Sequence, residues 1–204
     1  MNAGIKVEVC PQCGAPAALI ASKCGYCEAE FIITSIASLD RFDRTGINKY
    51  ISHYKSLLKN EPDSGELNLA MGICNLDLGL YDLAAKFFAK AIEAMPDRAE
   101  GYYYYSIVIV RGRKPKLLTL SEVKKIEEYL QAAIQIDANK AKYHYFWLII
   151  KHEFYTKNGL KINPPTISDL IEQGKSAQYD EQEIAKMMTR VPVTDTELLS
   201  IIRR

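Results

Sequence analysis

The stretch Gly65–Arg98, GELNLAMGICNLDLGLYDLAAKFFAKAIEAMPDR, decides how most of this chain is expected to fold. Its first half has apolar residues at steps of three and four, the period of an amphipathic helix: Leu67, Met71, Cys74 and Leu78. Gly79 interrupts this pattern, and a second helical pattern follows up to Pro96. Because Pro96 lies 34 residues after Pro62, the stretch indicates a repeat made of two helices.

Small and aromatic residues in this stretch suit two closely packed helices. Gly72 and Ala84 allow the helices to approach where they cross, while Phe88 and Ala91 fill the space between neighbouring pairs. With a glycine between the helices and a terminal proline, these positions resemble the tetratricopeptide repeat family at that family's spacing: Gly72, Gly79, Ala84, Phe88, Ala91 and Pro96. The resemblance implies an all-α superhelix of stacked helix pairs that carries a groove for protein partners.

Weaker copies of the pattern flank the strong one, so that the resemblance covers about residues 45–157. Upstream, Tyr50, Tyr54, Leu57 and Pro62 match the second helix of a preceding repeat, whose first helix would be 35–43 or absent. Downstream, a first helix is predicted over 102–110, with Ser106 at the place of Gly72. Its second helix is predicted over 121–136, with an N-cap at Ser121 and with Leu130 and Ala133 at the places of Phe88 and Ala91. A further first helix is predicted over 140–157.

The C-terminal segment, 158–204, departs from the repeat pattern. A helix is predicted over about 166–174, and two capping boxes at 180–183 and 194–197 predict two more short helices. Because a repeat array must bury its last apolar face, we expect this segment to form a helical cap.

Four cysteines near the N-terminus form two CxxC pairs separated by ten residues: Cys10, Cys13, Cys24 and Cys27. Two residues between thiolates allow a tight turn to aim both sulfurs at one ion, and two such turns complete the four-sulfur shell that zinc prefers. A disulfide interpretation is weaker, because Met1–Val9 lacks the apolar core of a secretory signal.

The region around these cysteines predicts a small β module. Val7, Val9 and Phe31–Ile33 are strand-like, and little else there can form a core, so one structural zinc ion would supply most of the folding free energy. The pattern resembles zinc-ribbon modules, with the ribbon over 5–34 and a linker over 35–47. Glu28 follows the second pair where Gly14 follows the first, which predicts slight strain at a left-handed turn.

Bulk composition gives no global attraction to nucleic acid or to anionic membranes. The chain has 204 residues, 26 basic and 25 acidic, for a net charge of +1. Its longest apolar run, Tyr143–Ile150, is too short to span a bilayer. Cysteines in metal-type spacing fit a reducing compartment, and a cytoplasmic protein is expected.

In the family that the chain resembles, the first helices of the repeats line a concave groove. By repeat register, the groove-facing, partner-binding residues over 48–157 are Leu69, Ile73, Tyr103, Ile107, Tyr145 and Ile149. These side chains replace the Lys, Asn and Arg clamp of the family's chaperone-tail binders, and they favour a partner helix or an apolar peptide segment. The alternative is that the C-terminal helices fill the groove.

One basic loop could contact phosphate: Arg111, Arg113, Lys114 and Lys116. It supports an alternative function, nucleic-acid binding through the loop and the zinc ribbon, although nearby glutamates dilute its field and a solvated loop is the simpler interpretation. Cys74 is expected to be a buried, inert thiol. His53, His144 and His152 lie at no ligand spacing, and no nucleotide-binding or hydrolytic motif occurs. The sequence therefore predicts a non-enzymatic adaptor or scaffold that binds another protein, with self-assembly through an exposed end of the array as a further possibility.

Overall fold

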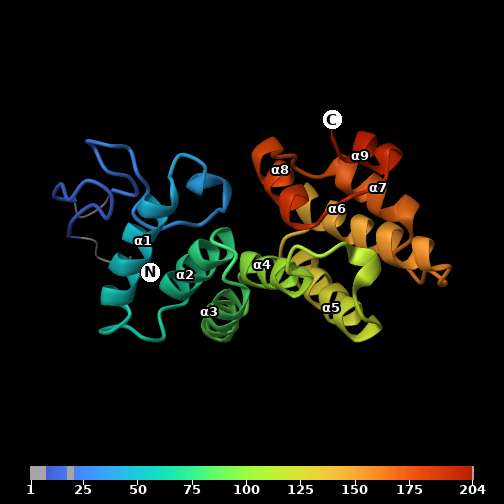
Figure 1. Cartoon of the computed structure of the whole chain (residues 1–204), viewed down its shortest axis with the longest axis horizontal. Coiled ribbons are helices and arrows are strands. Elements are labelled where there is room, and N and C mark those ends of the chain that lie inside the picture. The colour runs from blue at the N-terminus through green and yellow to red at the C-terminus, as the bar shows by residue number, and fades with distance from the viewer. Residues whose placement is uncertain (1–7, 18–20, 204) are drawn as a thin grey trace. The chain divides into compact units, whose positions relative to one another are not determined.

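The computed structural model describes residues 8–17 and 21–203. Helices make up most of this described part: α1 (Arg44–Leu57), α2 (Gly65–Asp77), α3 (Tyr81–Ala94), α4 (Ala99–Val110), α5 (Leu120–Ile136), α6 (Ala141–Ile150), α7 (Ile167–Ser176), α8 (Glu181–Arg190) and α9 (Thr196–Ile202) (Figure 1). The all-α fold class is confirmed. Within the described residues no helix combines the length and the apolar character that crossing a bilayer requires.

The chain divides into two compact units, one up to Ala91 and one from Ile92. In the first unit α1 packs against α2, and Gly79 makes the turn to α3 with a left-handed φ of 74°. A Cβ on Gly72 would lie closer than 3.0 Å to three ring atoms of Phe88. The small residue predicted at the helix crossing is therefore required there by sterics.

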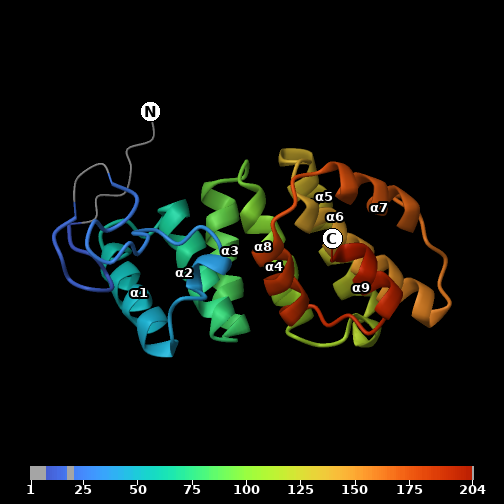
Figure 2. The ribbon, with the colours of Figure 1, turned by 90° about the horizontal axis from the view of Figure 1, so that it is seen from above.

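In the second unit α4 packs on α5, α5 on α6, and α6 on α7, while α8 contacts both α4 and α6 (Figures 1 and 2). α6 continues through a π-helical turn, η3 (Lys151–Tyr155), and a 3-10 turn, η4 (Thr156–Asn158), and ends at Gly159 with a left-handed φ of 66°. A single helical segment over 141–158 thus stands where a helix over 140–157 was predicted.

The segment 35–43 forms only a 3-10 turn, η1 (Ala37–Leu39), which agrees with the predicted alternative that the first helix of the upstream repeat is absent. Two predicted helix starts need correction. α5 begins at Leu120, one residue earlier than predicted, because its N-cap is Thr119, which forms a capping box with Glu122, and not Ser121. The N-cap of α9 is Asp195 and not the predicted Thr194, since the Asp195 carboxylate accepts a hydrogen bond from the N–H of Leu198. The N–H of Thr194 donates to Glu153.

The N-terminal module contains two single antiparallel bridges, Val9 with Pro16 and Lys23 with Glu30, and no longer strand in its described part. Its small core includes two of the cysteines, Cys10 and Cys24, together with Ala29 and Phe31. Residues 1–7 and 18–20, which include Val7 and part of the segment that joins the two cysteine pairs, lie outside the described residues.

Candidate functional site

The four cysteines Cys10, Cys13, Cys24 and Cys27 converge at one place. All four Sγ atoms lie within 4.8 Å of one another. The Sγ atoms of Cys10 and Cys27 are 3.6 Å apart, as are those of Cys13 and Cys24. A zinc ion at about 2.3 Å from each of four sulfurs in a tetrahedron requires sulfurs roughly 3.8 Å apart. The cluster therefore fits one tetrahedral zinc ion, and the separations are far too long for disulfide bonds.

The two cysteine turns share one hydrogen-bond pattern. In the first, the N–H of Gln12 points at the Sγ of Cys10 at 3.4 Å, and in the second the N–H of Tyr26 points at the Sγ of Cys24 at 3.5 Å. Backbone N–H groups of Cys27 and Tyr26 lower the pKa of the Cys24 thiol to about 6. This favours the thiolate of Cys24, the form that binds a metal, whereas at Cys27 the Ala29 N–H lowers the pKa but burial and the neighbouring thiols raise it to about 12.

The left-handed position that ends each turn is occupied as the sequence predicts. Gly14 has a φ of 74° and Glu28 a φ of 57°. An L-residue with a side chain pays about 1–2 kcal/mol for this conformation, so the strain predicted at Glu28 is present in the fold.

Side chains of α1 and of Arg41 just before it hold the cysteine module by hydrogen bonds to the backbone carbonyls of the module. The Arg41 guanidinium donates to the carbonyl oxygens of Cys27 (2.6 Å) and Glu28 (3.2 Å). From α1, the Tyr50 hydroxyl donates to the carbonyl of Glu30 at 2.8 Å, and the buried Tyr54 hydroxyl donates to the carbonyl of Phe31 at 3.0 Å. The module and α1 therefore form one packed body.

The six residues predicted to face a groove are all buried, with at most 2% of each exposed: Leu69, Ile73, Tyr103, Ile107, Tyr145 and Ile149. Tyr145 lies against α7, where a Cβ on Gly174 would come within 3.0 Å of its ring. A partner could reach these side chains only if the covering helices moved, and contact with a partner remains a prediction for them.

Helix α8 is fixed over α4 and α6 by a buried ion pair. Lys142 of α6 lies 2.7 Å from the carboxylate of Glu183, and its ammonium group also stands over the Tyr103 ring at 4.9 Å. The Tyr104 hydroxyl donates to the same carboxylate at 3.3 Å. The C-terminal helices thus cover these aromatic side chains, as the alternative interpretation of the groove anticipated.

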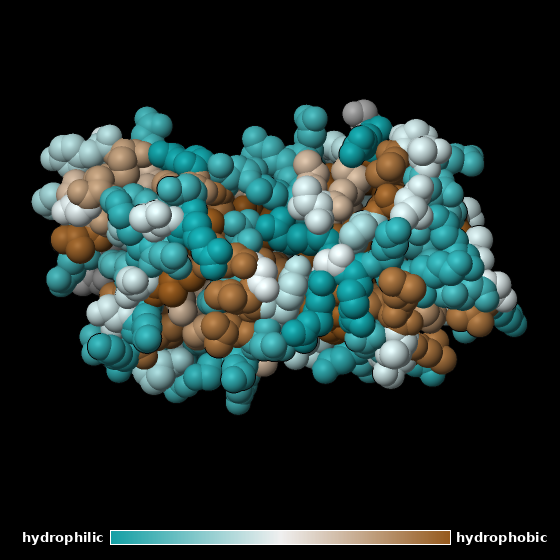
Figure 3. Space-filling model, in the orientation of Figure 1, coloured by the Kyte–Doolittle hydropathy of each residue, from teal (hydrophilic) through white to brown (hydrophobic). Residues whose placement is uncertain are grey.

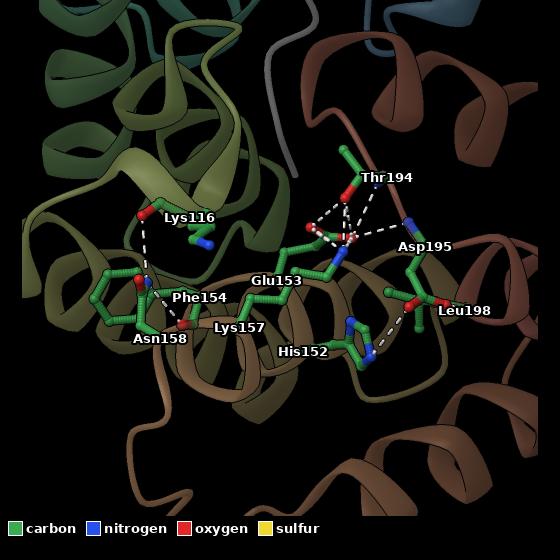
Figure 4. A network of polar contacts seen from close by, with 9 residues as sticks. All are labelled: Lys116, His152, Glu153, Phe154, Lys157, Asn158, Thr194, Asp195 and Leu198. Atoms are coloured by element: carbon green, nitrogen blue, oxygen red, sulfur yellow. Dashed lines mark hydrogen bonds and ion pairs between the residues drawn. The ribbon is translucent and has the colours of Figure 1, made fainter.

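A second buried carboxylate attaches the last segment to the end of α6. Glu153 accepts from the N–H of Thr194 (3.0 Å), the N–H of Asp195 (3.2 Å) and the Lys157 ammonium (3.0 Å) (Figure 4). Burial by itself would raise the pKa of Glu153, but the bonds from Lys157 and Thr194 lower that pKa overall. The carboxylate is therefore held ionised and serves as a structural link.

The first unit contains a pocket that sequence reasoning did not identify. It has a volume of about 360 Å³ and lies between α1, α2 and α3. Its walls are apolar, from Ile51 and Leu58 on one side and Leu83 and Phe87 on the other. In Figure 3 hydrophobic atoms gather over α2 and α3 on the face shown, bordered by hydrophilic atoms. Leu83 is 45% exposed, so the wall faces solvent.

A comparison of the repeats could have revealed this pocket. Its floor is formed by Asn68, Met71 and Asn75 of α2. A shift of 34 residues, which places Ser106 on Gly72, brings Tyr102, Tyr105 and Ile109 to these positions in α4. In the second unit Tyr102 and Tyr105 stack on Tyr129 of α5, with ring centroids 6.0 and 4.9 Å apart. Asn68 and Met71 on α2 thus leave open a space of the kind that Tyr102 and Tyr105 fill on α4.

The basic loop does not present four unpaired cations. Arg113 forms an ion pair with Glu122 at 2.6 Å and donates to the carbonyls of Val110 and Ile109. This contact lowers the pKa of the Glu122 carboxyl. Of the remaining predicted phosphate contacts, Arg111 ends α4 in the left-handed conformation, and Lys114 and Lys116 flank Pro115 in η2 (Pro115–Leu117).

The other candidate reactive groups have structural surroundings. Cys74 is buried, and burial raises the pKa of its thiol, as expected for an inert cysteine. The Nε2 of His144 lies 2.8 Å from the carbonyl of Ala138, and that of His152 lies 3.7 Å from Asp195. In the part of the chain that the structure describes, the four cysteines are the one group of three or more potential ligands placed to hold a metal.

Comparisons with known proteins give a likeness of fold. No family model matches the sequence, and no curated protein matches it. Solved structures of MamA are similar. A crystal structure of MamA is 20% identical over 79% of this chain and 77% of that chain, with a TM-score of 0.49. MamA from residue 41 to its end, from Desulfovibrio magneticus RS-1, is 16% identical over 75% and 70% of the two chains, with a TM-score of 0.47. Similarities of this size carry no functional information.

Proposed function

We propose that this chain is a non-enzymatic adaptor that binds another protein, and that one structural zinc ion holds its N-terminal module. In this proposal residues 5–34 form the metal module, 48–157 the helical repeats and 158–204 the cap. The pocket between α1, α2 and α3 is the observation that carries the proposal, because it is open, apolar and built on packed helices.

The surroundings of the pocket support binding rather than catalysis. Hydrophobic side chains exposed beside a pocket are a common feature of sites that recognise other proteins. Among the described residues the lining of this pocket contains no histidine, cysteine, serine or carboxylate to act as nucleophile or base. A bound partner side chain would remove Leu83 and Phe87 from water, which stabilises a complex by about 25 cal/mol per Å² of apolar surface.

The adaptor proposal is tested by purifying the tagged chain from its native cell extract, with and without nuclease. A protein that co-purifies in stoichiometric amount and survives nuclease and moderate salt supports the proposal. The variant Leu83→Glu tests the pocket in the same experiment, and Leu117→Glu, at an exposed leucine outside the pocket, is its control. Recovery of nucleic acid alone, lost with nuclease or salt, would refute the proposal in favour of the nucleic-acid alternative.

The zinc proposal rests on the donor set. Four thiolate sulfurs at tetrahedral separations, with backbone N–H groups directed at two of them, would form a closed shell without an open position for substrate. Metal analysis should find about one zinc per chain. Cys13→Ser should lower this content, and Cys74→Ala, which changes the cysteine outside the cluster, should leave it unchanged. Protein purified without chelators that holds no zinc would contradict the assignment.

A further inference from the structure

The rim of the pocket in the first unit carries positive charge from three lysines. Lys55 and Lys59, one helical turn apart at the end of α1, and Lys90 of α3 all line the pocket, and all three are exposed. In the part of the chain that the structure describes, none of these ammonium groups has a carboxylate partner, and the pocket lining contains no acidic residue. The pocket is therefore apolar inside and cationic at its edge.

The floor of the pocket contains an unsatisfied acceptor. Asn68 is 1% exposed, and its Nδ2 donates to the carbonyls of Pro62 (3.0 Å) and Ser64 (2.8 Å). Its Oδ1 is buried and accepts no hydrogen bond within the described chain. A buried oxygen without a donor costs roughly 1–3 kcal/mol, so a ligand that supplied an N–H or O–H there would gain from satisfying it.

We propose that this pocket binds an acidic segment of a partner protein. The segment places one bulky apolar side chain between Leu83 and Phe87 and its carboxylates on the lysines of the rim. This inference rests on the proposed adaptor function and gives its partner a chemistry. The second unit gives the contrast: tyrosines fill the corresponding space there, and the lysine near them, Lys125, stands over the rings of Tyr105 and Tyr129.

The three exposed lysines of the rim predict how binding of an acidic segment depends on salt. Exposed ion pairs contribute little individually and are screened by salt. Three such pairs act mainly by selecting acidic over basic segments and by speeding association, while the apolar side chain supplies most of the affinity. Binding should therefore weaken with added salt without vanishing.

The test uses the full chain with its metal and short random peptides displayed on phage. Peptides recovered on the wild-type protein are synthesised and titrated by fluorescence anisotropy at low and high salt. We expect acidic peptides with at least one large apolar residue. The triple variant Lys55→Glu, Lys59→Glu, Lys90→Glu should weaken their binding roughly tenfold or more.

A second triple variant with the same change in net charge distinguishes an effect at the pocket from an effect of the protein's total charge. The variant Lys124→Glu, Lys161→Glu, Lys175→Glu changes three exposed lysines of the second unit and should weaken binding less than about twofold. Leu83→Ser tests the wall without adding charge and should also weaken binding. Circular dichroism of each variant establishes that it is folded.

Each other outcome would overturn the proposal. Recovered peptides that are neutral or basic, or that bind both triple variants equally, exclude an acidic partner segment at this pocket. A wild-type dimer in sedimentation that Leu83→Ser dissociates assigns the pocket to a second copy, and a lipid retained in native mass spectrometry assigns it to a small molecule. If a protein from the native extract still binds the pocket variants, the adaptor function stands and only this inference fails; if no protein binds, both fail.

Discussion

The α2–α3 and α4–α5 hairpins follow one plan but treat equivalent positions in opposite ways. Both pack a helix that carries a small residue at the crossing, Gly72 or Ser106, against a partner helix. On α4 two tyrosines fill the space beside the partner helix and stack on Tyr129. On α2 the equivalent positions hold Asn68 and Met71, which leave a pocket of about 360 Å³ beside Phe87.

The difference shows that the same helix-pair plan can give a filled interior, as in α4–α5, or an open apolar pocket, as in α2–α3. Aromatic residues bury large areas and fix the second unit internally. The same unit is closed by the ion pair of Lys142 with Glu183 and by the hydrogen bonds that the N–H groups of Thr194 and Asp195 donate to Glu153. In the first unit the cysteine module contacts α1, which forms one wall of the pocket.

If the proposed zinc ion is bound, its removal should change the first unit much more than the second, the largest effect expected here. Chelation, or Cys24→Ser, should release the module and loosen α1, because structural zinc contributes on the order of 10 kcal/mol to such modules. Hydrogen exchange with mass spectrometry should show faster exchange over 21–57 and unchanged protection in α5 and α6. Restored zinc should reverse the change, and equal loosening of both units would contradict the assignment of the metal to the first.

Adding a methyl group to a glycine at a helix crossing should give the next largest loss of stability, and it should do so in both units. Gly72→Ala pushes a Cβ into Phe88, and Gly174→Ala pushes one into Tyr145. Overpacking costs about 1–3 kcal/mol and outweighs the gain in helix propensity. Hydrogen exchange in α2 and fluorescence of Trp147, the single tryptophan, report the two units separately. Gly25→Ala, with no atom near its added Cβ, is the control. Phe88→Leu should restore much of the loss in Gly72→Ala.

Replacing the aromatic residues at equivalent positions of α5 and α3, Tyr129 and Phe87, by alanine should show how differently the two hairpins are packed. Tyr129→Ala removes contacts with two tyrosine rings and should cost about 2–3 kcal/mol. Phe87→Ala only enlarges an existing pocket and should cost about 1 kcal/mol. Hydrogen exchange of α5 and α3 measures each loss where it occurs. Equal costs would mean that the two hairpins are packed alike.

The smallest effect should be the response of the second unit to acid. Because the pKa of Glu153 is lower in the folded protein than in the unfolded chain, its contribution is complete above the ordinary glutamate range. It is lost as the pH falls through the folded pKa, which burial alone would raise but which lies below the ordinary glutamate range because Lys157 and Thr194 stabilise the carboxylate. Trp147 fluorescence in an acid titration should show this step in the wild type. In Glu153→Gln it should be absent, with about 1 kcal/mol less stability at neutral pH. Glu128→Gln, at an exposed glutamate, should keep it.

Several elements were predictable because their signals are local. The helices of the strong repeat follow from a period of three and four, and the crossing at Gly72 follows from the need for a small residue beside Phe88. The convergence of the four cysteines follows from two CxxC turns. The predicted start of α9 was wrong, because the N-cap is Asp195 and not Thr194. The N–H of Thr194 instead donates to Glu153, 41 residues earlier in the chain, and no local pattern indicates this contact.

The sequence by itself determined the all-α repeat architecture, the helix pairs and the cluster of four sulfurs, since each follows from short patterns, helical periods and CxxC turns, that recur along the chain. Only the tertiary structure decided that the six predicted groove residues are buried and that a pocket lies over Asn68 and Met71. It also decided that Glu153 joins the last segment to α6. The physical reason is that burial and empty volume depend on which side chains meet across helices, and no periodicity within one helix records the size of the side chains that face it.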